Sequence, residues 1–91
     1  MMTIEEGIFI PKDVWEIDNL SFMDKAFLSE FKRLDNGNGT KITNLELSEI
    51  FKVTKARCSG IVTDLKNKGY IKVSYNKQNT RTIKIKEFEN E

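Results

Sequence analysis

The stretch that decides the fold is residues 42–73, ITNLELSEIFKVTKARCSGIVTDLKNKGYIKV. Thr43 and Glu46 have the spacing of a capping box, in which each side chain satisfies a free backbone amide of the other residue. A helix is therefore expected to begin at this point. Three apolar residues then recur at helical spacing and are expected to be buried: Leu47, Ile50 and Phe51.

A second helix is predicted directly after a turn at Lys52 and Val53. Thr54 is suited to cap its first turn, and Gly69 is suited to end it. The apolar residues of this helix follow the i, i+3, i+4, i+7 pattern of a buried stripe: Cys58, Ile61, Val62 and Leu65. Its place on the stripe makes Cys58 a packing residue rather than a reactive thiol.

The apolar periodicity changes from helical to alternating after the second helix. Residues 70–75 and 80–86 each alternate apolar with polar side chains, and the polar run 76–79 between them is typical of a turn. A β-hairpin is therefore predicted. Tyr70 and Tyr75 could flank a groove, but packing of the hairpin on the preceding helix is the favoured expectation.

Upstream, residues 21–34 are predicted to form another amphipathic helix, with Ser21 as its cap. The segment GIFIPKDVWEI, residues 7–17, is expected to be extended up to Pro11 and then to make a helical turn. Five aromatic residues are expected to belong to the core: Trp15, Phe22, Phe27, Phe31 and Phe51. The predicted fold is α+β and mainly α, a single domain over residues 1–91 with three helices and a C-terminal two-stranded hairpin.

The loop RLDNGNGTKITNLE, residues 33–46, has the Asp, Asn, Gly and Glu content of a calcium-binding loop. With Asp35 at position 1, Glu46 falls on position 12, but glycines occupy the ligand positions 3 and 5. With Gly39 at position 6, where the turn requires glycine, positions 1 and 12 are both leucines. Because neither register supplies a calcium ligand set, the loop is predicted to be an interhelical turn followed by the Thr43 cap.

The chain has one cysteine and no histidine, which excludes an internal disulfide, a Cys/His zinc site and histidine-based catalytic triads. No nucleophile–base pair or phosphate-binding loop is visible in the sequence, so neither catalysis nor a metal or other cofactor is expected. No apolar run has the length of a signal peptide or a membrane span, which favours a cytoplasmic protein without a membrane partner.

Charge is distributed unevenly along the chain. Residues 1–51 carry five Lys or Arg and ten Asp or Glu, a net charge of −5, whereas residues 52–86 carry ten Lys or Arg and one Asp, a net charge of +9. The acidic tail, residues 87–91, adds −3 and is expected to be frayed beyond a folded core of residues 7–86. A basic half of this kind favours an anionic partner such as nucleic acid.

Four blocks of the chain, IFIPKDVW, NLSFMDKAFLSEFKRLDNGNG, ITNLELSEIFKVTKARCSGIVTDLKNKGYIKV and TIKIK, resemble the winged helix-turn-helix modules of phage and plasmid replication proteins, of the replisome organiser and initiator type. The resemblance covers residues 7–86 and implies that the helix after Thr54 enters the major groove of duplex DNA. Two positions depart from the pattern. Lys52 occupies the turn, where glycine is usual, and Gly60 occupies a place where the recognition helix often carries a long polar side chain. The second departure weakens the expectation of base readout.

The predicted DNA-binding surface combines the solvent face of this helix with the hairpin turn. Small residues opposite the buried stripe permit close approach to the groove, and the cations beside them can hold phosphates. Arg57 is the best candidate for a guanine contact. The predicted site residues are Thr54, Lys55, Ala56, Arg57, Ser59, Gly60, Thr63, Lys66 and Asn67 in the helix, and Lys77, Gln78, Asn79 and Arg81 at the tip of the hairpin.

The leading expectation is a duplex DNA-binding module of a phage or plasmid replication initiator, with replication proteins or a second copy of the chain as further partners. Two alternatives remain open. One is a small transcriptional repressor of a mobile element. The other is a winged-helix module that binds another protein through the same surface, where Ala56 and Gly60 would allow a partner helix to pack closely.

Overall fold

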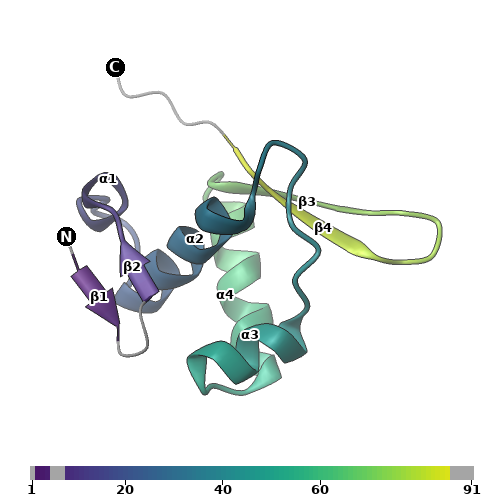
Figure 1. The fold of residues 1–91 in the computed structure, drawn as a ribbon, viewed down its shortest axis with the longest axis horizontal. Coiled ribbons are helices and arrows are strands. Elements are labelled where there is room, and N and C mark those ends of the chain that lie inside the picture. Colours follow the sequence, from purple (N-terminus) through teal and green to yellow (C-terminus); the bar gives the residue numbers. More distant parts are fainter. Residues whose placement is uncertain (1, 5–7, 87–91) are drawn as a thin grey trace.

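The computed structural model describes residues 2–4 and 8–86, which form four helices and two separate antiparallel hairpins (Figure 1). The α+β class is as predicted. The helical turn expected after Pro11 forms a fourth short helix, and the extended segment before it pairs with a strand, Met2–Ile4, that was not expected. The acidic tail, residues 87–91, lies outside the described residues. The helices are α1 (Lys12–Trp15), α2 (Phe22–Leu34), α3 (Asn44–Phe51) and α4 (Lys55–Asn67), and the strands are β1 (Met2–Ile4), β2 (Ile8–Ile10), β3 (Ile71–Tyr75) and β4 (Arg81–Ile85).

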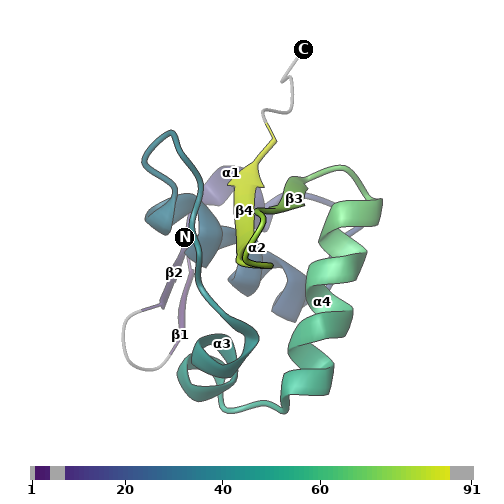
Figure 2. The ribbon, with the colours of Figure 1, turned by 90° about the vertical axis from the view of Figure 1, so that its right-hand side faces the viewer.

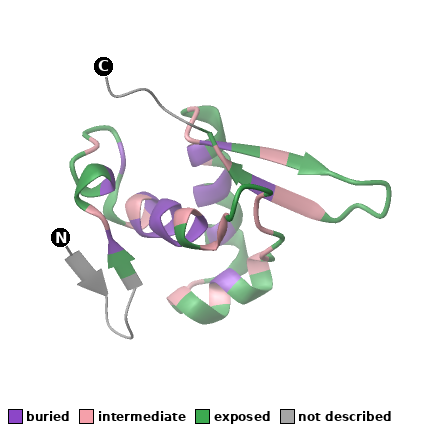
Figure 3. Cartoon of the chain, turned by 45° about the horizontal axis from the view of Figure 1, so that its top comes forward, coloured by how far each residue is buried: buried purple, intermediate pink, exposed green. Residues whose placement is uncertain are grey.

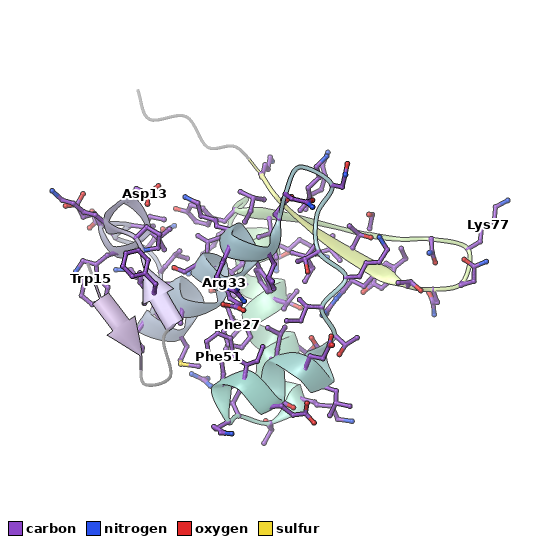
Figure 4. The ribbon with its side chains drawn as sticks, in the orientation of Figure 1. Asp13, Trp15, Phe27, Arg33, Phe51 and Lys77 are labelled. Atoms are coloured by element: carbon purple, nitrogen blue, oxygen red, sulfur yellow. The ribbon has the colours of Figure 1, made fainter. Side chains whose placement is uncertain are left out.

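Helix α2 supplies the centre of the core. Ser21 caps it as predicted, because its hydroxyl accepts a hydrogen bond from the Asp24 amide at 3.1 Å. Phe27 and Phe31 are fully buried, and the Phe27 ring stacks on Phe51 of α3 with a centroid distance of 4.3 Å (Figure 4). Figure 3 shows the buried residues gathered on α2, on the inner side of α4 and at the base of the β3–β4 hairpin. The remaining core residues are Ile10, Val14, Leu20, Ala26, Leu28, Leu47, Cys58, Ile61, Val62, Leu65, Ile71 and Ile83.

Three residues that were predicted to be buried lie at the surface. Trp15 is 37% exposed, Phe22 is 43% exposed and Ile50 is 36% exposed. Trp15 and Phe22 lie where α1 approaches the start of α2, and their rings pack edge to face at 6.3 Å, so each covers the other. Ile50 is exposed because α3 has only eight residues and enters the core mainly through Leu47, which is fully buried.

Helices α3 and α4 begin at the predicted caps. The capping box is complete, with the Thr43 amide donating to Glu46 Oε1 at 2.9 Å and the Glu46 amide donating to Thr43 Oγ1 at 3.1 Å. Thr54 caps α4 through the Arg57 amide at 3.1 Å. Between the helices Lys52 has φ 59° and ψ 43°, a left-handed conformation that costs a residue with a Cβ about 1 kcal/mol.

The predicted apolar stripe of α4 is confirmed, since Cys58, Ile61, Val62 and Leu65 are all buried. Burial also raises the pKa of the Cys58 thiol, as expected for a packing residue. The chain leaves α4 through Gly69, whose φ of +88° suits glycine.

Strands β3 and β4 form the predicted C-terminal hairpin, which projects from the body of the molecule (Figure 1). Ile71 and Ile83 anchor its base in the core. Tyr70, just before β3, packs against the core, and its hydroxyl donates a hydrogen bond to Asn19 Oδ1 at 3.0 Å. The expectation that Tyr75 packs on the preceding helix is wrong. Its side chain is 63% exposed because it lies beyond the buried part of the hairpin.

A strap, residues 35–40, leads from α2 past β4. Thr40 and Ile83 form an isolated antiparallel bridge in which each amide donates to the other carbonyl at 2.8 Å. Gly39 makes this close approach possible. It has φ +84°, and a Cβ at its position would lie 2.9 Å from the Ile83 carbonyl oxygen.

Asp35 fixes the conformation of the strap. Its Oδ1 accepts hydrogen bonds from the amides of Gly37 and Gly39, and its Oδ2 accepts one from Ile85 of β4, all at 2.8 Å. These three bonds lower the pKa of Asp35. The interhelical turn predicted for this segment is confirmed, and the Asp35 carboxylate serves to join it to the hairpin.

Candidate nucleic-acid interface

The outer face of α4 is open to solvent along its whole length, and Figure 2 shows this helix beside the β3–β4 hairpin. At Gly60 no described atom lies within 4 Å of where a Cβ would be. The nine residues predicted for this part of the site are all exposed: Thr54, Lys55, Ala56, Arg57, Ser59, Gly60, Thr63, Lys66 and Asn67.

One side of this face, here called the hairpin flank, borders the β3–β4 hairpin. Ser59, Thr63 and Lys66 of α4 line a cavity of about 120 Å³ together with Val73 and Tyr75 of β3. Asn44, Val62 and Arg81 complete its lining. Among the described residues no acidic side chain lines this cavity, so its polar surface consists of hydroxyls, amides and cations.

The other side, here called the α2 flank, borders the start of α2. Arg57 and Asp64 of α4 line a cavity of about 430 Å³ with Asp24 of α2 and Lys68. Lys68 Nζ lies 3.1 Å from Asp64 Oδ2 and 4.0 Å from Asp24 Oδ2. The α2 flank therefore combines the Arg57 cation with two carboxylates that the chain itself brings together.

The two carboxylates of the α2 flank have pKa values shifted in opposite directions. Asp24 is only 5% exposed, and burial together with the neighbouring Asp64 raises the pKa of Asp24 to about 6. The hydrogen bond from Asp24 lowers the pKa of Asp64. Above pH 6 both groups are ionised, which makes this flank less attractive to a phosphate than the hairpin flank.

Arg81 was expected at the hairpin tip, and the structure corrects this. It is the first residue of β4, and its guanidinium turns back toward the body of the molecule, donating from Nη1 to Asn44 Oδ1 and from Nη2 to the Ile42 carbonyl, both at 2.8 Å. Its side chain is therefore half-buried at the floor of the hairpin flank rather than extended at the tip.

The other three hairpin residues of the prediction do lie in the exposed turn. Lys77 is at the far end of the hairpin from the body of the molecule (Figure 4), and Gln78 and Asn79 are exposed beside it. Asn76 holds the turn, because its Oδ1 accepts the amides of Gln78 and Thr80, each at 2.9 Å.

Several lysines of the basic half lie away from this surface. Lys72 and Lys84 face each other across the hairpin ladder and are exposed on the side opposite the core. Lys68 is engaged by Asp64 and by the Asn19 carbonyl, to which it donates at 2.7 Å. The positive charge of residues 52–86 is thus concentrated on α4 only in part.

Sequence reasoning missed two residues of the candidate surface, Asn44 and Asp24, and did not favour a place for Tyr75 in it. Tyr75 had a visible signal, because it continues the apolar alternation of β3 beyond the residues that the core can cover. Asn44 and Asp24 gave no such signal in the sequence. Asn44 directly follows the Thr43 cap, and Asp24 belongs to the capping motif of α2.

No known protein family, no curated protein and no solved structure matches this chain. Within the described residues, no helix has the length and apolar character needed to cross a membrane. The same part of the chain contains no group of three or more His, Cys, Asp or Glu side chains placed to hold a metal ion.

Proposed function

We propose that this chain binds duplex DNA as a winged helix-turn-helix, with α4 in the major groove and the β3–β4 hairpin as the wing. The observation that carries the proposal is the exposure of α4. The helix buries one apolar stripe and presents Lys55, Arg57 and Lys66 on its open side, next to a projecting hairpin. A helix with its side chains is about 10–12 Å across, which fits a major groove about 12 Å wide, and the 13 residues of α4 extend about 20 Å along it.

The biological role that we propose is a DNA-binding module of a phage or plasmid replication initiator. The support is the resemblance of the IPKDVW and LDNGNG blocks, which lie outside the helix-turn-helix. In this fold the first block forms the end of β2 and α1, and the second forms the end of α2 and the strap. A transcriptional repressor of a mobile element would use the same DNA surface.

Fluorescence anisotropy with a labelled duplex at several salt concentrations tests the DNA proposal. About six phosphate contacts would give a slope of log affinity against log salt near −5. Binding that does not weaken as salt rises would contradict DNA binding. It would favour the protein-interaction alternative, in which a partner helix packs on the same face of α4 at the exposed Ala56 and Gly60.

A triple variant then tests the assignment of the surface. Replacing Lys55, Arg57 and Lys66 together with alanine should lower the affinity about 100-fold and reduce the salt slope by about 3, because three phosphate contacts are lost. Thermal unfolding should change little, because all three side chains are exposed.

The matched control removes the same charge from the outer face of the hairpin: Lys72→Ala, Lys84→Ala and Lys86→Ala. This variant should lose no more than a few-fold in affinity, through the weaker general field alone. Equal losses in the two triple variants would show that net charge rather than the α4 face drives binding.

A further inference from the structure

Arg81 is a half-buried cation that has no counter-ion within the described part of the chain. Its guanidinium donates hydrogen bonds to two neutral acceptors, Asn44 Oδ1 and the Ile42 carbonyl, each at 2.8 Å, and no described carboxylate lies within 4.0 Å of it. Burial lowers the pKa of Arg81, and the groups that act against that shift are the Tyr75 phenol and the Cys58 thiol, not a carboxylate. By contrast, Arg33 forms a two-point pair with Glu30. Because an uncompensated charge is costly to bury, Arg81 is a candidate for binding an anion from outside.

The space around Arg81 suits an anion. The guanidinium borders the cavity of about 120 Å³ on the hairpin flank and a second cavity of about 380 Å³ on the side of residues 41–44. The only ionisable side chains that accompany it there are Lys66 in the first cavity, Lys41 in the second and the phenol of Tyr75, which borders both. The other polar side chains around the two cavities are hydroxyls and amides: Ser59, Thr63, Thr43, Thr80, Asn44 and Asn79.

We infer that Arg81 is a fixed phosphate anchor, which binds one phosphodiester of the DNA backbone where that backbone passes between α4 and the hairpin. The inference rests on the proposed function. A guanidinium has five N–H donors, and two nitrogens hold Asn44 and Ile42, so the Nε–H and the second hydrogens of both terminal nitrogens remain for the phosphate. Because Asn44 and the Ile42 carbonyl already hold the Arg81 guanidinium in place, little side-chain entropy is lost when it binds a phosphate.

Two substitutions test the anchor in the same anisotropy measurement. Arg81→Gln should lower affinity about tenfold at 0.1 M salt and reduce the salt slope by about 0.9, the value of one phosphate contact. Arg81→Lys keeps the charge but lacks the paired N–H donors of a guanidinium. It should therefore retain the salt slope and lose about threefold in affinity. Lys72→Gln, which removes one charge from the outer face of the hairpin, is the control and should change neither quantity.

A measurement on the unmodified protein covers the case in which the Arg81 variants do not fold. The chain has three arginines, Arg33, Arg57 and Arg81, so their Nε–H signals can be followed by nuclear magnetic resonance in ¹⁵N-labelled protein. Titration with the duplex should shift the Arg81 signal and leave that of Arg33, which is paired with Glu30, in place. Inorganic phosphate at matched ionic strength should shift the Arg81 signal in the same direction but only at much higher concentration.

Three results would overturn the inference. If the duplex binds but the Arg81 variants behave like Lys72→Gln, the anchor is wrong and the DNA proposal stands. The anchor is also wrong, and the DNA proposal stands, if DNA saturates the protein without moving the Arg81 signal. The result with inorganic phosphate does not alter this conclusion. If the unmodified protein binds no duplex even at low salt, the proposed function fails and the anchor fails with it.

Discussion

The two flanks of α4 belong to one helix but differ in the charge that accompanies them. On the hairpin flank Lys66 and Arg81 face hydroxyls and amides, with no acidic side chain among the described lining residues. On the α2 flank Arg57 shares its cavity with Asp24 and Asp64. A DNA backbone would therefore be attracted more strongly to one side of the helix than to the other.

Asp24 and Asp64, the acids of the α2 flank, each make a contact that supports the fold. Asp24 lies in the first turn of α2, where a carboxylate favours the positive end of the helix dipole. Asp64 holds Lys68, which also donates to the Asn19 carbonyl and so joins the end of α4 to the α1–α2 loop. These acids thus limit the proposed DNA surface on this side, and the hairpin flank avoids the conflict because its described lining residues include no carboxylate.

The largest effect is expected where the hairpin flank depends on the strap. Gly39→Ala should lower the free energy of unfolding by about 3–4 kcal/mol, because the new Cβ would lie 2.7 Å from Thr82 Cγ2 in a backbone with φ +84°. Chemical denaturation measures the loss. At low temperature, where the variant is folded, its DNA affinity should also fall, because the bridge between Thr40 and Ile83 supports the hairpin.

Gly37→Ala is the matched control in the same turn. Gly37 has φ +112°, but no described atom lies within 4 Å of where its Cβ would be. Gly37→Ala should therefore lower the free energy of unfolding by about 1–2 kcal/mol, through backbone strain alone. An equal loss of unfolding free energy at the two glycines would mean that a Cβ at Gly39 does not clash with β4. The strap would then not explain how the hairpin is held beside α4.

The next effect concerns the acids of the α2 flank. The folded-state pKa of Asp24, about 6, lies above the ordinary value of 3.8, so the folded protein binds the proton more tightly than the unfolded chain does. Its contribution to stability is present below pH 4 and is lost as the pH rises through 6. Asp24→Asn should thus match the unmodified protein at pH 4 and exceed its free energy of unfolding by about 2 kcal/mol at pH 8.

Urea denaturation at pH 4, 6 and 8 checks this expectation, with Asp18→Asn, an exposed carboxylate of the preceding loop, as the control. The lowered pKa of Asp64 acts at lower pH, below this window, and does not reverse the sign. Asp24→Asn also removes a negative charge from the cavity that Arg57 lines, so it should raise the DNA affinity a few-fold at pH 8. A difference in stability that does not depend on pH would show that burial does not raise the pKa of Asp24.

Local signals predicted most of the fold. The caps at Ser21, Thr43 and Thr54 each depend on a bond between residues three apart, so spacing alone reveals them. The stripe of α4 and the alternation of the hairpin are equally local. The misplaced aromatics show the limit of periodicity, because Trp15 and Phe22 have apolar character but lie at the surface, where their rings pack edge to face on each other.

Several hydrogen bonds that engage charged side chains in the structure join residues far apart in the chain. Asp35 and Ile85 are 50 residues apart, Lys68 and Asn19 are 49 apart, and Arg81 and Asn44 are 37 apart. Each such bond diverts a charged side chain to a structural contact, and no spacing rule shows this. The candidate cations could be named from the sequence, but which of them are available to a partner required the fold.

The smallest effect is expected at Gly60, on the crest of α4 between the two flanks. Gly60→Ala should raise the free energy of unfolding by about 0.5–1 kcal/mol, because alanine favours a helix and the added methyl meets no described atom within 4 Å. If α4 lies in the major groove, the same methyl holds the helix away from the base edges, so DNA affinity should fall severalfold although the protein is more stable. Thermal unfolding and anisotropy on one sample separate the two effects. Unchanged affinity in the stabilised variant would mean that the crest does not touch the groove, and that the flanks alone make the contact.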